Sequence, residues 1–494
     1  MKAWQSCRQR VYIGLCATLI LVGLLLCAGC RTYSPSVSAP ADTVSSGSVD
    51  ILTPRSSNDL DPNAPLNTWN NVTHDIARQL KHHGFSEKNI SHSTASTLKE
   101  QIKQLTDLVK SHSANTDKTT HILMLSPVFY KDSTQGAAIR QRYGDLVTPA
   151  VATSSLDDDS ADENEQEEAQ QQHAELVKQL VKAQKAGIIV VLMGQKVPDF
   201  TENYYISFST PQSIARLQTE NLVKKLQLDK ATADDPQAVE MILPMNVGSE
   251  FNKSAFSASW KILKPYFVTG VAYSPSGLLD AHTTAQDWRN VTITDDSEST
   301  VSEAVYARLN ASKKSYAHID GILAFTDHTA HGVVAALKSM GYTGSSAMIN
   351  PEITLESIVK TLSGNADVNK QRIPRPSPIT SDKEYKHTSS SPSSAQNTLS
   401  WPIITSFGVY ISDLPDVING KIWISSMEDR AALSESVASL CTYLVKGLTG
   451  SQLENKVPHL TSTTLTTPLF AVTADNVKKT LLDTGYITPA DAGL

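Results

Sequence analysis

The segment "IDGILAFTDHTAHGVVAALKSMGYTG", residues 319–344, decides the fold class because it reads as a strand followed by a helix. Residues 319–325 are apolar and predict a buried strand, and the apolar spacing after Asp327 predicts an amphipathic helix that ends near Gly341 and Gly344. Asp327 stands where the strand turns into the helix. It either caps the helix or contacts a ligand, because ligands of parallel α/β folds bind beyond the carboxyl ends of the strands.

The same alternation of strand and helix runs along most of the chain. Apolar runs predict strands at 49–54, 121–127, 188–194 and 238–245, and segments of helical period stand between them. Alternating strands and helices favour parallel sheets covered by helices. The pattern therefore predicts an α/β protein with two successive doubly wound, Rossmann-like parallel-sheet lobes.

Two segments interrupt this pattern. Residues 157–168, "DDDSADENEQEE", hold eight acids and no apolar residue beyond Ala161, and residues 375–400 are dominated by Ser, Pro and charge. Segments of such composition bury little apolar surface, so both are expected to be solvated loop insertions.

The N-terminus has the pattern of an export signal. A basic leader and an apolar run, residues 11–26, precede Ala28-Gly29-Cys30, which resembles a bacterial lipobox with cleavage before Cys30 and lipidation of its thiol. A plain membrane anchor over the same apolar run is the alternative. Residues 1–29 are thus expected to be a lipoprotein signal peptide and 31–48 a flexible Ser/Pro linker. The body would lie outside the cytoplasm, anchored to the outer face of the cell membrane.

Composition narrows the possible partners. Cleavage before Cys30 takes the net charge from −7 to about −10, which makes nucleic acid an unexpected partner. Cys441 would be the one cysteine of the folded body, so a disulfide within the chain and a cysteine-based metal site are not expected. His328 and His331 share a helical spacing, but no third ligand accompanies them, and no metal or cofactor is predicted.

Several stretches resemble a known family, the type I periplasmic sugar-binding proteins of ABC importers, and within it most closely the D-xylose-binding branch. The resemblance covers nearly all of residues 49–490 and is carried by "NYYISFSTPQSIARLQTENLV" (203–223), "WKILKPY" (260–266), residues 319–344 and "VPHLTSTTLTTPLFAVTADNVKKTLLDTGYI" (457–487). It is interrupted by insertions at 128–172 and 364–421, which are expected to be largely disordered.

The resemblance implies two lobes joined by a three-strand hinge. The N-terminal lobe would comprise 49–208 plus 428–450, and the C-terminal lobe 209–427 plus 451–494. Such a protein is not an enzyme. As a monomer it would close on a monosaccharide or similar polar molecule and deliver it to a membrane permease.

The resemblance also implies a set of ligand-binding residues, which differ in part from those of the family. Asp327 retains the family's acid at the end of its strand. Gly194-Gln195 and Ser209-Thr210 replace an Asp-Arg and an Asp-Asn pair, Glu352 aligns with a family acid, and Glu428 falls near a family Lys. Gln195 can donate and accept, and the two glutamates would favour a polyol, an amino sugar or a cationic ligand. For Glu428 a solvated surface charge is the alternative.

Three further positions join this set. Trp69 and Trp288 align near family tryptophans, and each either stacks on a sugar ring or is buried within its own lobe. Asn252 aligns loosely with a family Asn that bonds the ligand. A surface sensor or protein-interaction module that keeps the fold without sugar transport is the competing hypothesis. An extracellular hydrolase is a third, but no catalytic motif supports it.

Overall fold

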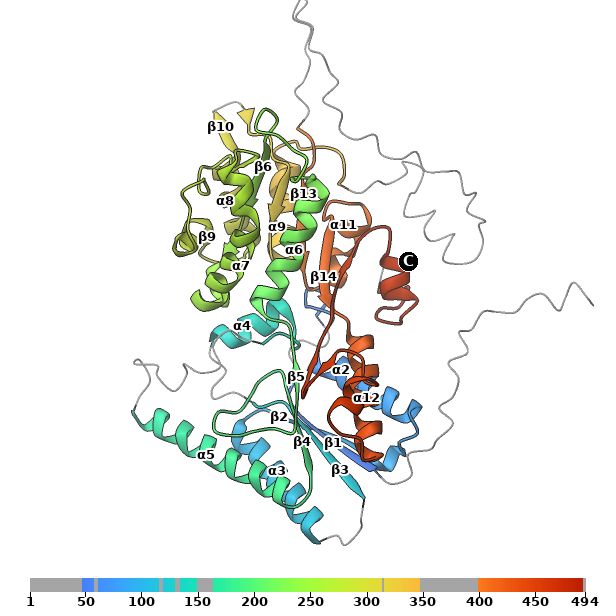
Figure 1. The fold of residues 1–494 in the computed structure, drawn as a ribbon. Coiled ribbons are helices and arrows are strands. Elements are labelled where there is room, and N and C mark those ends of the chain that lie inside the picture. Colours follow the sequence, from blue (N-terminus) through green and yellow to red (C-terminus); the bar gives the residue numbers. More distant parts are fainter. Residues whose placement is uncertain are drawn as a thin grey trace, which may run out of the picture. The chain divides into compact units, whose positions relative to one another are not determined.

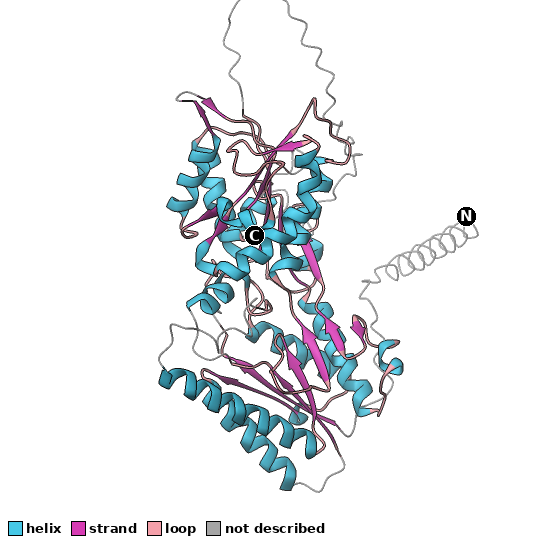
Figure 2. Cartoon of the chain, turned by 60° about the vertical axis from the view of Figure 1, so that its left-hand side comes forward, coloured by secondary structure: helices cyan, strands magenta, loops and turns pink. Residues whose placement is uncertain are grey.

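The computed structural model describes residues 47–56, 61–114, 119–128, 134–148, 163–312, 315–346 and 399–491. Two main sheets organise the described part of the chain, and helices pack against both faces of each (Figure 1, Figure 2). The predicted fold class, α/β with two parallel-sheet lobes, is thereby confirmed. Within these residue ranges no helix has the length and apolar character needed to cross a membrane.

The first sheet has the strand order β15-β16-β5-β4-β3-β1-β2, and all neighbouring pairs are parallel except β15 and β16. Its strands are β1 (Gly47–Pro54), β2 (Ile90–Ala95), β3 (Thr120–Leu125), β4 (Ile189–Met193), β5 (Tyr204–Ser207), β15 (Leu460–Thr461) and β16 (Thr464–Thr466). Ile51 packs with α2 (Trp69–His82) and α12 (Arg430–Val445), and Leu52 packs with α3 (Leu98–Ala114) and α5 (Glu163–Lys185). Alternate residues of one strand thus reach opposite cores. Figure 1 shows α12 beside α2, far apart in sequence.

The second sheet has the order β17-β14-β13-β12-β6-β8, in which only β17 runs antiparallel to its neighbour. Its strands are β6 (Gln237–Met241), β8 (Ala272–Tyr273), β12 (Gly321–Leu323), β13 (Ile403–Phe407), β14 (Ile424–Glu428) and β17 (Leu469–Val472). One core holds α6 (Pro211–Leu226) and α7 (Ser249–Val268), and the other holds α8 (Glu298–Leu309) and α9 (Asp327–Ser339).

Shorter elements complete the described chain. They are α4 (Thr134–Tyr143), α11 (Leu414–Ile418), α13 (Ser451–Glu454) and the small strands β7 (Leu243–Pro244), β9 (Thr292–Ile293), β10 (Asn310–Ser312) and β11 (Ser315–Tyr316). Short 3-10 helices are η2 (Glu87–Asn89), η3 (Met245–Val247), η4 (Ala285–Val291) and η5 (Ile411–Asp413), and η6 (Lys478–Leu482) is a short π-helix. The chain passes from one main sheet to the other after β5, after β14 and after β16.

Parts of the segments predicted to be unstructured are regular. Helix α5 begins at Glu163, inside the acidic run, because Glu and Gln are good helix formers. Side chains four apart also bond: Gln171 Nε2 donates to Glu167 Oε1 at 3.2 Å, and Gln172 repeats this with Glu168 at 2.9 Å.

The predictions that the two insertions are largely disordered and that the linker extends to residue 48 also differ from the structure. Helix α4 lies within 128–172, and β13 and α11 lie within 364–421. Strand β13 is a buried strand of the second sheet, so this part of the expected insertion belongs to the core. Strand β1 begins at Gly47, before the predicted end of the linker. The signal peptide, Cys30 and Glu352 lie outside the described residues.

Candidate functional site

The carboxyl ends of β4 and β5 bring Gln195 and Ser209 to one edge of the first sheet. Thr148 joins the two segments, because its amide donates to Ser209 O at 2.8 Å and its hydroxyl donates to Gly194 O at 2.7 Å. Gln195 and Ser209 are each only 3% exposed. Among the described residues, neither amide atom of Gln195 nor the hydroxyl of Ser209 has a hydrogen-bond partner. Buried polar atoms without partners are uncommon in folded proteins.

Glu428 at the end of β14 carries a third such group. Its side chain is fully buried, so the prediction of a solvated surface charge is wrong. Asn67 Nδ2 donates to Glu428 Oε2 at 2.9 Å and to Glu428 O at 3.0 Å, whereas Oε1 has no partner among the described residues. Burial raises the pKa of Glu428 to about 7, and the nearby Asn67 and Ser209 partly oppose that rise. Glu428 thus belongs with Gln195 and Ser209.

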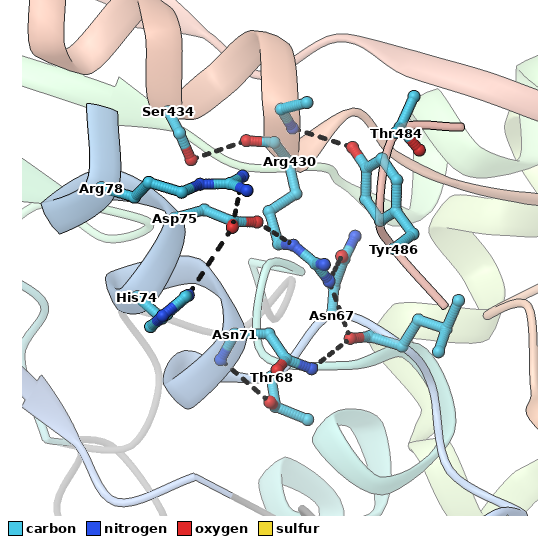
Figure 3. A network of polar contacts seen from close by, with 12 residues as sticks. Asn67, Thr68, Asn71, His74, Asp75, Arg78, Arg430, Ser434, Thr484 and Tyr486 are labelled. Carbon is cyan, nitrogen blue, oxygen red and sulfur yellow. Dashed lines mark hydrogen bonds and ion pairs between the residues drawn. The ribbon is translucent and has the colours of Figure 1, made fainter. Parts of the chain in front are cut away.

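Arg430 holds Asn67 in place, as Figure 3 shows. Its Nε forms a 2.5 Å ion pair with Asp75 Oδ2 on α2, and its guanidinium lies 4.4 Å from the centre of the Tyr486 ring. Its Nη1 donates to Asn67 Oδ1 at 3.4 Å, which leaves the Asn67 amide nitrogen turned toward Glu428. Arg430 is therefore engaged with Asp75, and it makes no ion pair with Glu428.

Aromatic rings border this polar group. Trp69 packs against Phe208 at a centroid distance of 5.5 Å, and Phe208 lies against Gly194 so closely that a Cβ there would come within 2.5 Å of the ring. Gly194 also has a φ of 73°, which favours glycine. Trp69 belongs to the core of the first lobe, and Trp288 to a core of the second, so the structure shows the burial alternative for both. Trp69 nonetheless contacts the residue next to Ser209.

Asp327 lies at the corresponding edge of the second sheet, and its hydrogen bonds are satisfied. Thr326 caps α9, because its hydroxyl accepts from Thr329 N at 3.2 Å, so the interpretation of Asp327 as the cap is wrong. The Asp327 carboxylate accepts from the hydroxyls of Ser406 and Ser425 and from Tyr410 N. Burial, and next the charge of Asp413, raise its pKa. Asp327 therefore joins the end of β13 and the start of β14 to α9.

Side chains from α4 pack on this second edge. The Tyr143 ring lies 4.6 Å from the Phe251 ring and 5.8 Å from the Phe407 ring, and its buried hydroxyl has no partner among the described residues. Arg142 Nε forms a 2.5 Å ion pair with Asp296 Oδ2. Side chains of α4 thus cover the carboxyl-terminal edge of the second sheet, which is where proteins of this fold class bind ligands.

The remaining predicted residue and the histidines lie near this contact. Asn252 is buried in α7, where its Nδ2 donates to Pro244 O at 2.8 Å while Oδ1 has no partner in the described part of the chain. His331 Nδ1 lies 3.0 Å from Asp413 Oδ1, and His328 Nε2 lies 3.8 Å from Asp296 Oδ1. Within the ranges that the structure describes, no three His, Cys, Asp or Glu side chains are grouped to hold a metal ion.

Gln195 and Glu428 thus keep polar atoms without partners in the described part of the chain, whereas Asp327 lies in a closed hydrogen-bond network of its own. Sequence reasoning missed Asn67 and Arg430, although "MEDR" places Arg430 two residues after Glu428. It also missed Tyr143, because α4 falls in a range that was expected to be an insertion.

No protein-family model and no curated protein matches the chain. Solved structures with low similarity include a solute-binding protein from Clostridium phytofermentans with bound β-D-glucose, at 18% identity over 90% of this chain and 99% of that one, with a TM-score of 0.47. A periplasmic ribose ABC transporter protein from Conexibacter woesei has 11% identity over 90% and 97%, TM-score 0.47. An arabinose-binding protein from Geobacillus stearothermophilus has 12% over 88% and 99%, TM-score 0.43. The function of this chain is therefore proposed from its own residues.

Proposed function

We propose that this chain is a lipid-anchored, extracytoplasmic solute-binding protein that captures a monosaccharide or a similar polar small molecule and delivers it to an ABC importer. The observation that carries the proposal is that polar atoms of Gln195, Ser209 and Glu428, at the carboxyl ends of three strands, have no partner among the residues that the structure describes. Leaving such atoms buried and unpaired costs about 1 to 3 kcal/mol each. A molecule with several hydroxyls supplies donors and acceptors for all of them.

A thermal-shift screen of the full chain in detergent micelles tests this function. Pentoses, hexoses, polyols, amino sugars and nucleosides are each added at millimolar concentration. A specific ligand present at about 100 times its Kd stabilises the folded state by about 2.7 kcal/mol, which raises the melting temperature measurably. Replacing Gln195 by Leu should remove the shift, whereas replacing the exposed Gln452 by Leu should leave it intact. The absence of a shift with every compound would contradict the proposal.

The lipid anchor is tested separately. Replacing Cys30 by Ser removes the thiol that would be acylated, and the protein should then pass from the membrane fraction to the soluble extracytoplasmic fraction or stay as an uncleaved precursor. If the variant is processed and remains in the membrane as the parent does, the lipid anchor is wrong.

A second function, a surface module that binds a protein partner and no sugar, is favoured by the contact that α4 makes with the second edge. There Tyr143 and the Arg142–Asp296 pair take up the space beside Phe251 and Phe407, and Asp327 offers no unpaired atom. Under this function the screen stays silent while pull-downs retain the same partner after Gln195 is replaced by Leu.

A further inference from the structure

Glu428 presents a buried carboxylate oxygen that no described residue contacts. The side chain is 0% exposed, its Oε2 is bonded to Asn67, and its Oε1 has no hydrogen-bond partner within the described ranges. Gln195 and Ser209 carry further polar atoms without partners within the described ranges, and Ser209 lies near enough to Glu428 to hold the pKa of its carboxyl below the value that burial alone would give. The group is therefore a site with one acid and two neutral side chains.

No cation of the described chain compensates this acid. Among the described residues, no Lys, Arg or His forms an ion pair with Glu428, and Arg430 is held by Asp75 and stacked on Tyr486. A buried ionised carboxylate without a counter-charge is costly, and with a neutral sugar Glu428 avoids that cost only by taking up a proton. A ligand that brings its own positive charge removes the cost and pairs with Oε1 at the same time.

The aromatic rings at the site are compatible with a positive charge. Phe208 immediately precedes Ser209 and packs against Trp69 in the core of the first lobe. Faces of aromatic rings attract ammonium groups, most strongly where water is excluded. Ring contacts alone do not distinguish a cation from a sugar face, but they add no barrier to either.

From these contacts we infer that the ligand is an amine-bearing polar molecule, such as an amino sugar, whose ammonium group pairs with Glu428 Oε1 while Gln195 and Ser209 bond its hydroxyls. This inference rests on the proposed function and narrows it to one chemical class. Asn67, held by Arg430, is a positioning residue that fixes one oxygen of the carboxylate and leaves the other for the ligand.

Isothermal titration of the full chain in detergent micelles at pH 7 tests the inference with matched probes. D-Glucosamine, D-galactosamine and D-mannosamine each carry the charge, their N-acetyl derivatives lack it, and D-glucose, D-galactose and D-mannose replace the amine by a hydroxyl. At least one amino sugar should bind tenfold or more tightly than both of its neutral counterparts.

Two variants make the assignment specific. Glu428→Gln keeps the shape and the bond from Asn67 but removes the charge, so it should weaken the amino sugar at least tenfold. Glu454→Gln, at an exposed position, should change nothing. Circular dichroism and urea unfolding of Glu428→Gln serve as the check that the variant is folded. If a neutral sugar binds as tightly as its amine and Glu428→Gln retains that binding, the inference is overturned while sugar capture stands. If no probe binds, the inference is overturned, and the wider thermal-shift screen with pentoses, polyols and nucleosides decides whether solute capture stands.

Discussion

Buried polar groups at the carboxyl ends of the strands are of two opposite kinds. Gln195, beyond β4 of the first sheet, and Glu428, the last residue of β14 of the second sheet, keep atoms without partners among the described residues, whereas Asp327, beyond β12 of the second sheet, receives three hydrogen bonds from the chain itself. All three positions lie at the carboxyl ends of parallel strands, so fold position alone does not make a binding residue. An acid whose carboxylate oxygens are all hydrogen-bonded within the chain stabilises the fold, and an acid with an unbonded oxygen is available to a ligand.

The largest expected effect is the loss of the Asp327 carboxylate. Asp327→Ala leaves the hydroxyls of Ser406 and Ser425 and the amide of Tyr410 buried without an acceptor, and it should lower the free energy of unfolding by about 4 kcal/mol. Urea unfolding measures the loss. Asp327→Asn keeps one acceptor oxygen and should lose about half as much. A loss below about 1 kcal/mol for the alanine variant would place Asp327 among the ligand residues instead.

A pH series compares the two buried acids directly. Burial raises the pKa of Glu428 from 4.5 to about 7, and burial with the charge of Asp413 raises that of Asp327. The folded state then holds these protons more tightly than the unfolded chain does. The resulting stability is fully present below about pH 4.5 and is lost as the pH rises to about 7, by up to about 3 kcal/mol for Glu428.

Urea unfolding between pH 4.5 and 7.5 measures this slope. The wild type should lose stability across the range, and Glu428→Gln should remove the part that belongs to Glu428. The exposed Glu454→Gln serves as the control and should follow the wild type. Equal slopes in the wild type and in Glu428→Gln would show that Glu428 titrates near its ordinary pKa and is not desolvated.

A smaller difference in the free energy of unfolding is expected between variants of two tyrosines at the carboxyl-terminal edge of the second sheet. Tyr410 donates its hydroxyl hydrogen to Arg142 O at 3.0 Å, whereas the buried Tyr143 hydroxyl finds no acceptor among the described residues. Tyr410→Phe should cost about 1 kcal/mol of unfolding free energy, and Tyr143→Phe should cost nothing or stabilise slightly. Thermal or urea unfolding of both variants decides this. A larger loss for Tyr143→Phe would mean that its hydroxyl is bonded.

The smallest effect on stability is expected at Gln195. Its amide has no partner in the part of the chain that the structure describes, so Gln195→Met, which has nearly the same volume and no polar amide, should change the free energy of unfolding by less than about 0.5 kcal/mol in the absence of ligand. The same variant should abolish the thermal shift given by any ligand found in the screen. A loss of several kcal/mol without ligand would show that Gln195 is bonded within the fold, as Asp327 is.

The sequence by itself determined the architecture. Alternation of apolar runs and helical spacing, as in residues 319–344, specifies the period of each element, and burial on both faces follows from continuous apolar strands. The prediction of a solvated loop at the acidic run was wrong in part, because α5 begins there at Glu163. The helix preference of Glu and Gln, which the prediction left out of account, explains this start.

Only the tertiary structure decided which acids are free. The partners of Asp327, Ser406 and Ser425, lie 79 and 98 residues further along the chain, so no local pattern reveals that its carboxylate is satisfied. The surroundings of Glu428, in the charged stretch "MEDR", suggest an exposed position, yet the strand that ends there carries it into the interior beside Asn67, 361 residues away. Burial and pairing arise from contacts between distant segments, and these contacts set both the pKa of an acid and its freedom to bind a ligand.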